Sequence, residues 1–194
     1  MTTNGISVIV LAGGQSRRFG RDKLAEPVDG RPLLHHAIGA VRPMATEIIV
    51  VAAPGAIPAL PPDVTLVHDT VAFEGPLAGL LGGLAVARSP TVVLVGGDMP
   101  ALSVAVLGSM VALLLASNAS VLVLEHDGRG RPLPMALRRE PALATVAALF
   151  ASGERRLRAL ADTMSAAVLP EAAWRAIDPE GDTLRDIDTE ADLA

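Results

Sequence analysis

The sequence predicts an α/β protein: a three-layer α/β/α sandwich built on a mostly parallel, Rossmann-like sheet. Short apolar runs rich in valine and isoleucine alternate with longer segments of helical periodicity, a pattern typical of parallel strands joined by helices. The apolar runs are nearly continuous, as expected for strands buried on both faces. With 194 residues, 51% of them hydrophobic, the chain can bury one sizeable core, so we expect a single domain over residues 1–194.

The first two thirds of the chain carry the clearest alternation. The predicted strands are Ile6–Leu11, Glu47–Ala52, Val64–Val67, Thr91–Gly96 and Ser120–Glu125. The predicted helices between them are Pro32–Val41, Pro76–Arg88 and Ser103–Ala116. A proline at the start of the first two helices fits the first helical turn, where its missing N–H is not needed.

The last third is less regular. Arg131–Leu137 could be a strand, but its prolines place it at a sheet edge or a bulge. Pro141–Phe150 and Glu154–Asp162 have helical patterns, and Thr183–Asp188 resembles a last strand leading into a short helix. Pro54–Asp63 contains four prolines and is expected to be a loop within the domain.

Composition argues against several classes of protein. A net charge of -5 and an aromatic content of 2% do not suit a nucleic-acid-binding surface or a base-stacking platform. The chain has no cysteine, so it has neither a disulfide framework nor a thiolate metal site. The first apolar run is too short for a signal or membrane helix. We therefore expect a cytoplasmic protein without nucleic-acid or membrane partners.

Lys23 is the only lysine, while fifteen arginines carry the other positive charges. It closes the glycine-rich segment LAGGQSRRFGRDK, residues 11–23, directly after a predicted buried strand. A strand, a glycine turn and several cations can hold a polyphosphate, and a compact ammonium suits a crowded phosphate better than a guanidinium does. The alternatives are a chance lysine and a solvated basic loop. The segment has neither the Walker A pattern nor G-x-G-x-x-G.

Two aspartates follow predicted strands at the same sheet edge. Asp98, in GGDMP, could hold Mg²⁺, which takes hard oxygen ligands and often only one or two from protein. It could instead cap the helix that begins near Ser103, although Ser103 is itself the better cap. Asp69 could accept hydrogen bonds from a base or ribose, or be an ordinary turn residue; the residues alone leave both open. Gly75 introduces a helix whose N-terminus faces the same edge.

Together these segments resemble the nucleotidyltransferases of molybdenum-cofactor maturation. LAGGQSRRFGRDK matches the family signature L-A-G-G-x-S-x-R-x-G-x-x-K, and EGPLAGL and GGDMP follow in the family order and spacing. GERRL (153–157) and DIDTEADL (186–193) resemble the C-terminal blocks. The resemblance thus runs from about Val8 to the end of the chain. The double glycine at 13 and 14 is similar to the guanylyltransferase branch, since the cytidylyltransferase branch usually reads L-A-A-G.

The resemblance implies a nucleotidyltransferase sheet, Mg²⁺ as cofactor, and GTP and molybdopterin as substrates. The positions that match nucleotide-binding residues are Leu11, Ala12, Gly13, Gly14, Lys23, Asp69, Gly75 and Asp98. Lys23, Asp98 and Arg17 are the implied catalytic residues, and Asp98 is the implied metal ligand. Candidates for binding the acceptor are Arg131, Arg155, Asp186 and Asp188. We also expect a monomer that makes transient contact with molybdoenzyme maturation proteins.

The chain departs from the family pattern at three places. Val51 or Ala52 stands where the guanylyltransferases commonly have asparagine, and Arg131-Pro132 replaces a usual His-Pro. Asp186 and Asp188 replace the asparagines of N-x-N-T, a change more familiar among the cytidylyltransferases. These changes bear more on the acceptor than on the base. The sequence therefore favours GTP, with CTP, another small-molecule nucleotidyl transfer, or nucleotide binding without turnover as alternatives.

Overall fold

The structure, a computed structural model, describes residues 5–13, 22–56, 58–68, 75–189 and 192. Its strands are β1 (Ile6–Ala12), β2 (Pro27–Val28), β3 (Arg31–Pro32), β4 (Glu47–Ala52), β5 (Val64–His68), β6 (Thr91–Gly96), β7 (Val121–His126), β8 (Arg129–Arg138) and β9 (Ala167–Leu169). Its α-helices are α1 (Leu33–Val41), α2 (Pro76–Val86), α3 (Val104–Ala116), α4 (Arg139–Ala151), α5 (Leu157–Thr163) and α6 (Glu171–Arg175). Short 3₁₀ turns are η1 (Lys23–Ala25), η2 (Arg42–Met44) and η3 (Asp182–Leu184).

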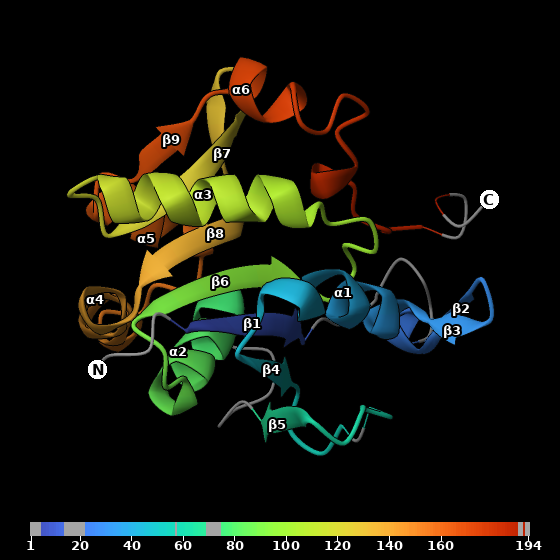
Figure 1. Ribbon diagram of the computed structural model, residues 1–194. Helices are drawn as coiled ribbons and strands as arrows, with labels where there is room; N and C mark the ends of the chain where they lie inside the picture. The colour runs from blue at the N-terminus through green and yellow to red at the C-terminus, as the bar shows by residue number, and fades with distance from the viewer. Residues whose placement is uncertain (1–4, 14–21, 57, 69–74, 190–191, 193–194) are drawn as a thin grey trace.

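One sheet organises the molecule. Within the described residues it has seven strands in the order β5-β4-β1-β6-β8-β7-β9 (Figure 1). β1 pairs in parallel with β4 and β6, and β4 pairs in parallel with β5. β8 is antiparallel to β6 and β7, and β9 is parallel to β7. The mostly parallel α/β sheet is thus confirmed, and the carboxyl ends of β5, β4, β1 and β6 meet at one edge.

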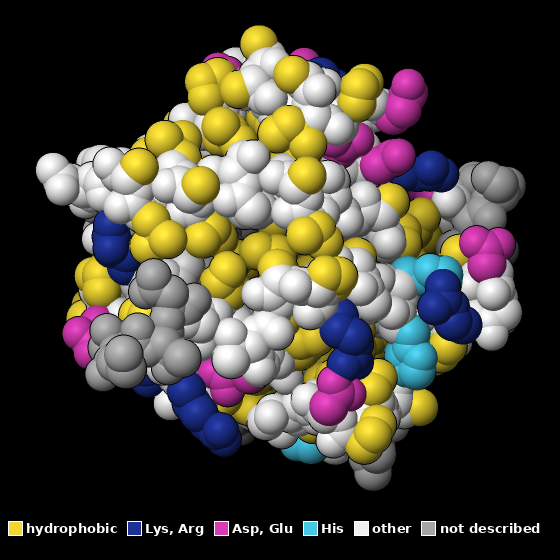
Figure 2. Space-filling view, in the orientation of Figure 1, with side chains coloured by type: hydrophobic (Ala, Val, Ile, Leu, Met, Phe, Trp, Pro, Cys, Tyr) yellow, Lys and Arg dark blue, Asp and Glu magenta, His cyan; other side chains and the backbone are white. Residues whose placement is uncertain are grey.

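Helices cover both faces of this sheet and form the outer layers (Figure 1). Alternate residues of β1 face opposite layers: Val8 and Val10 pack with α1 and α3, whereas Ile9 packs with α2. These residues are all 0% exposed, which explains why the strand reads as a continuous apolar run. α3 has no charged residue, and the band over it in Figure 2 shows only hydrophobic or uncharged side chains.

β8 decides between the two positions expected for this proline-containing strand, a sheet edge or a bulge, in favour of the bulge. The strand lies inside the sheet, between β6 and β7, and not at an edge. The expected bulge is present: Val123 pairs with Met135 and Leu124 with Arg131, so residues 132–134 drop out of the ladder. Prolines are tolerated there because the residues of the bulge form no ladder hydrogen bond with the neighbouring strand, so the missing N–H is not needed.

The expected strand over residues 183–188 is wrong. Its first residues form part of η3, and residues 185–188 are irregular. The Asp178 carboxylate accepts the backbone N–H groups of Asp182 and Thr183 at 3.2 and 2.8 Å, which turns the chain locally. Beyond this turn the segment crosses the end of β6, so its backbone pairs with a loop and not with a strand.

Candidate active site

At the carboxyl edge of the parallel strands, the start of the LAGGQSRRFGRDK motif lies beside the GGDMP motif. Leu11 and Ala12 end β1, Gly13 follows as an exposed residue, and Asp98 lies two residues beyond β6. The loop is tied to β1 by a hydrogen bond from the Gly97 N–H to the Leu11 carbonyl, at 2.9 Å. A Cβ atom at Gly96 would collide with the Asp98 carboxylate, so a glycine there lets Asp98 turn back over the strand end.

Lys23 is the centre of the site. Its ammonium donates to Asp98 Oδ2 at 2.8 Å, to the Ile187 carbonyl at 2.9 Å and to Asp188 Oδ1 at 3.0 Å. The Lys23 side chain is 14% exposed, against 27% for Asp98 and 50% for Asp188. Burial opposes the ammonium charge, but hydrogen bonding and attraction from Asp98 and then Asp188 outweigh it, so the pKa of Lys23 is raised. The structure thereby joins residues from three distant motifs around one cation.

Residues 186–189 and 192, which we call the C-terminal segment, complete the arrangement around Lys23. The Ile187 N–H donates to the Asp98 carbonyl at 3.0 Å, and Asp192 Oδ2 accepts the N–H groups of Asp188 and Thr189 at 3.0 and 2.7 Å. Burial, followed by repulsion from Asp188 and Asp98, raises the pKa of Asp186. The acceptor role expected for Asp186 and Asp188 did not include the contacts of Ile187 and Asp188 with Lys23. The Ile187 contact is made by its backbone carbonyl, which leaves no residue-type signature, and the Asp188 contact joins side chains far apart in the sequence.

The start of α2 is fixed by the GERRL segment. Gly75 precedes the helix with φ +90°, and a Cβ atom there would lie 2.9 Å from the Arg155 carbonyl oxygen. That oxygen accepts the Leu77 N–H at 3.2 Å. The Arg155 guanidinium donates to the Phe150 carbonyl at 3.0 Å and lies over the Phe150 ring at 4.1 Å. The structure therefore places Gly75 at the helix N-terminus, as expected, and Arg155 beside it.

The remaining candidates are more dispersed. Arg131 is exposed near the start of β8, and because Leu94 is the last β6 residue paired with β8, Arg131 extends past the end of β6 toward the edge that holds Asp98. Ser103 caps α3 by accepting the Val106 N–H at 3.4 Å, which removes the alternative role of Asp98 as that cap. Gly14, Arg17 and Asp69 lie outside the described residues.

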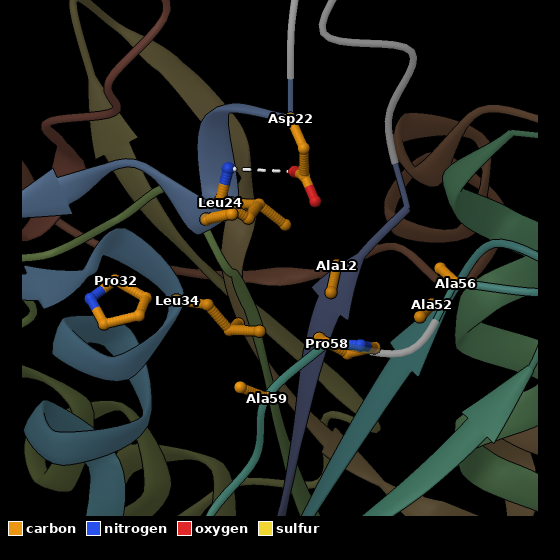
Figure 3. A pocket seen from close by; sticks show the side chains of 10 residues that line it. Ala12, Asp22, Leu24, Pro32, Leu34, Ala52, Ala56, Pro58 and Ala59 are labelled. Carbon is orange, nitrogen blue, oxygen red and sulfur yellow. Dashed lines mark hydrogen bonds between the residues drawn. The ribbon is translucent and has the colours of Figure 1, made fainter.

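A small hollow lies beside the site, between the ends of β1 and β4. It has a volume of about 230 Å³ and is lined by Ala12, Asp22, Leu24, Ala25, Pro32, Leu34, Ala52, Ala56, Pro58 and Ala59. Figure 3 shows the Asp22 carboxylate at its rim, where it accepts the Leu24 N–H at 3.1 Å. The Ala52 methyl group lines the hollow at the end of β4, where Val51 or Ala52 replaces the asparagine expected from the family resemblance, so this part of the hollow is apolar.

A second group of potential metal ligands has a structural role. His126, Asp127 and Glu171 lie close together where β7 ends and α6 begins. Glu171 accepts from Arg175 Nε at 2.9 Å and from the Asp127 N–H at 2.9 Å, and its Oε1 lies 3.1 Å from His126 Nδ1. Arg175, then the Asp127 N–H and then His126 lower the pKa of Glu171 to about 2. These contacts already engage the carboxylate in fastening α6 to the sheet.

The fold defines an α/β protein whose mostly parallel sheet recurs among solved structures. The molybdopterin-guanine dinucleotide biosynthesis protein A from Archaeoglobus fulgidus shares this fold with a TM-score of 0.80, 21% identity, and coverage of 96% of this chain and 94% of that one. The 2-C-methyl-D-erythritol 4-phosphate cytidylyltransferase from Thermus thermophilus matches with a TM-score of 0.72, 19% identity, and coverage of 97% and 95%.

Relatives in sequence show to which family of α/β proteins the chain belongs. A probable molybdenum cofactor guanylyltransferase from Chloroflexus aggregans is 33% identical over 97% of this chain and 91% of its own length. One from Mycobacterium avium is 36% identical over 95% and 91%. The family model of the MobA-like NTP transferase domain matches residues 8–168. The chain therefore belongs to the MobA-like NTP transferase family, and the resemblance seen in its motifs is confirmed. No helix in the described part of the chain is both long and apolar enough to span a membrane.

Proposed function

We propose that this nucleotidyltransferase moves GMP from GTP to the terminal phosphate of molybdopterin and releases pyrophosphate. The observation that carries the proposal is the Lys23–Asp98 pair at the carboxyl edge of the sheet, 2.8 Å apart, which joins the last residue of the signature segment to the GGDMP motif. Ligands bind at this edge in open α/β sheets. The guanylyltransferase names of the relatives support guanine as the base and molybdopterin as the acceptor.

The oxygen atoms around Lys23 suit a magnesium ion. Two carboxylates and one carbonyl converge on a single positive charge, and such hard oxygen donors are the ligands that Mg²⁺ prefers. We propose that Asp98 holds Mg²⁺ together with the nucleotide. When bound, the ion would neutralise part of the triphosphate charge. The Lys23 ammonium would then turn from the carboxylates to the phosphates, which present the same oxygen chemistry.

The proposed reaction needs positioning and charge stabilisation from the protein, but no general base. An oxygen of the acceptor phosphate forms a bond to the α-phosphorus, and the bond from that phosphorus to the bridging oxygen breaks, so pyrophosphate leaves with the electron pair. The attacking oxygen is already an anion and needs no general base. The protein must bring two polyanions together and stabilise the developing charge, which is the task we assign to Lys23, Arg17 and the backbone amides after Gly13.

The other residues of the site divide between nucleotide and acceptor. We assign Leu11, Ala12, Gly14, Asp69 and Gly75 to the nucleotide, and Gly75 would add the positive end of the α2 dipole. We assign Arg131, Arg155, Asp186 and Asp188 to the acceptor side. The chain would act as a single cytoplasmic domain, as a monomer, and would meet molybdoenzyme maturation proteins only transiently.

Two measurements test the proposal. Pyrophosphate release should require GTP, Mg²⁺ and molybdopterin, with little release when a simpler phosphorylated compound replaces molybdopterin. Isothermal titration of GTP with and without Mg²⁺ distinguishes an enzyme from a protein that only binds nucleotide. Tight GTP binding without any pyrophosphate release would favour the binding protein, and release with another acceptor would replace molybdopterin in the proposal.

A further inference from the structure

Ile187 has an unusual set of contacts for an apolar residue. Its backbone N–H donates to the Asp98 carbonyl at 3.0 Å, and its backbone carbonyl accepts from the Lys23 ammonium at 2.9 Å. Its side chain points away from these groups into a small apolar cluster and is 3% exposed. One residue therefore touches both members of the proposed catalytic pair through its backbone while its side chain anchors it.

The apolar cluster links the segments that carry the charges. Its buried members are Ile187 and Leu33, with Leu24 and Val28 packed against them. Leu24 follows Lys23 in the chain, just as Ile187 precedes Asp188, so each charged residue has a neighbour in the same cluster. Leu24 also packs against the large core that contains α1 and α3, whereas Ile187 and Leu33 are buried in the small cluster alone. The packing of the small cluster therefore sets where the signature segment and the C-terminal segment lie relative to each other.

The physical need for such an anchor is plain. Lysine has a long, flexible side chain, and an exposed ion pair that must immobilise it gains little free energy. An ion pair becomes effective when its partners are already held in place, because less conformational entropy is then lost. Here the cluster holds the backbone on both sides of the Lys23–Asp188 contact, and the Ile187 N–H fixes the Asp98 loop.

We infer that Ile187 is a positioning residue: in the nucleotide-free protein its backbone groups hold the Lys23 ammonium beside Asp98, at the place where the phosphates would meet it. The placement of Lys23 follows from the contacts alone, whereas its effect on catalysis rests on the proposed function. Ile187 thus gives the C-terminal block a role in the nucleotide half of the site, in addition to the acceptor role assigned to its aspartates.

The single lysine allows a direct test in the nucleotide-free protein. An amine-reactive acylating reagent, followed by mass spectrometry of the peptide that contains residue 23, reports the accessibility of the Lys23 ammonium and no other side chain. We expect the labelling rate to rise from wild type through Ile187→Val to Ile187→Ala, reaching about fivefold, as for the loss of one hydrogen bond of ordinary net strength. Ile38→Ala is the matched control, since Ile38 is 1% exposed in the core under α1; it should lower the melting temperature and leave labelling unchanged.

An activity assay distinguishes the positioning role of Ile187 from the catalytic role of Lys23. If Ile187 positions Lys23 and Lys23 is catalytic, Ile187→Ala should lower kcat and raise the Mg²⁺ concentration needed for half-maximal rate, while Ile38→Ala changes neither. Faster labelling with unchanged kinetics would support the positioning role and count against the catalytic role of Lys23. Wild-type labelling in folded Ile187→Ala would overturn the inference. Should that variant fail to fold, wild-type labelling in Ile187→Val would overturn it equally.

Discussion

Replacing Lys23 removes the charge on which the proposed site converges. Lys23→Met keeps the length of the side chain and deletes the ammonium, whereas Lys23→Arg keeps the charge and changes its shape. In the structure three acceptor oxygens from different residues converge on one nitrogen atom at 2.8, 2.9 and 3.0 Å. A guanidinium spreads its donors over a planar fork and does not reproduce that convergence.

The size of the effect follows from the exposure of the contacts. Asp188 is 50% exposed, so solvent screens its pairing and it contributes little. The contact with Asp98, where both side chains are mostly covered, resembles a hydrogen bond to a charged group worth about 1.5–3 kcal/mol. If phosphate oxygens replace these carboxylates in the reaction, Lys23→Met should lower kcat/KM for GTP roughly 10- to 150-fold. Lys23→Arg should lose at least about tenfold.

The assay is pyrophosphate release with GTP varied at saturating Mg²⁺ and molybdopterin. Arg88→Met is the matched control, because it removes the same charge from a side chain that is 88% exposed; its kinetics should equal those of the wild type. Circular dichroism checks that each variant is folded. Wild-type kcat/KM in folded Lys23→Met would refute the role of the ammonium, and full activity in Lys23→Arg would refute the reasoning from its shape.

Three further predictions concern other parts of the molecule. Asp98→Asn should fold, lose most of its activity and need more Mg²⁺; an unchanged Mg²⁺ dependence would remove Asp98 from the metal site. Gly75→Ala forces a side chain onto a backbone with φ +90° and against the Arg155 carbonyl; it should cost about 1–3 kcal/mol in thermal unfolding, and an unchanged melting temperature would contradict the observed geometry. Glu171, whose pKa is lowered to about 2 chiefly by Arg175, should stabilise the fold fully above pH 4.5 and lose this contribution as the pH falls toward 2. The fluorescence of the single tryptophan, followed during acid titration, should show this loss in the wild type and less of it in Glu171→Gln; identical curves would contradict it.

Long elements with a clear pattern could be predicted from the sequence. The strands at residues 6–12, 47–52 and 91–96 were predicted to within one residue. Short apolar runs rich in valine and isoleucine favour a buried strand over a helix. β9 and α6 were missed, since three and five residues are too few to show a period. For β8 the prolines predicted a sheet edge or a bulge, and the structure shows the bulge, which accommodates them within the sheet.

The candidate site was predictable only in part. Lys23 and Asp98 were visible because an unusual residue type and a glycine-flanked aspartate each follow a strand on the same edge. Their direct contact, and the approach of Asp188 from the end of the chain, depend on tertiary packing that no local pattern encodes. The start of α5 at Leu157 has a similar origin: the Glu154 carboxylate accepts the N–H groups of Arg155 and Arg156 and holds them in a turn before the helix.

A competition between nucleotides is the most direct test of guanylyl transfer to molybdopterin. The wild-type protein would receive equimolar GTP and CTP with Mg²⁺ and molybdopterin, and mass spectrometry would count the dinucleotide products. A site that satisfies the donors of guanine leaves acceptors unpaired when cytosine enters, so we predict the guanine dinucleotide in at least about tenfold excess. Equal or greater formation of the cytosine dinucleotide, or no dinucleotide at all, would contradict the proposed function.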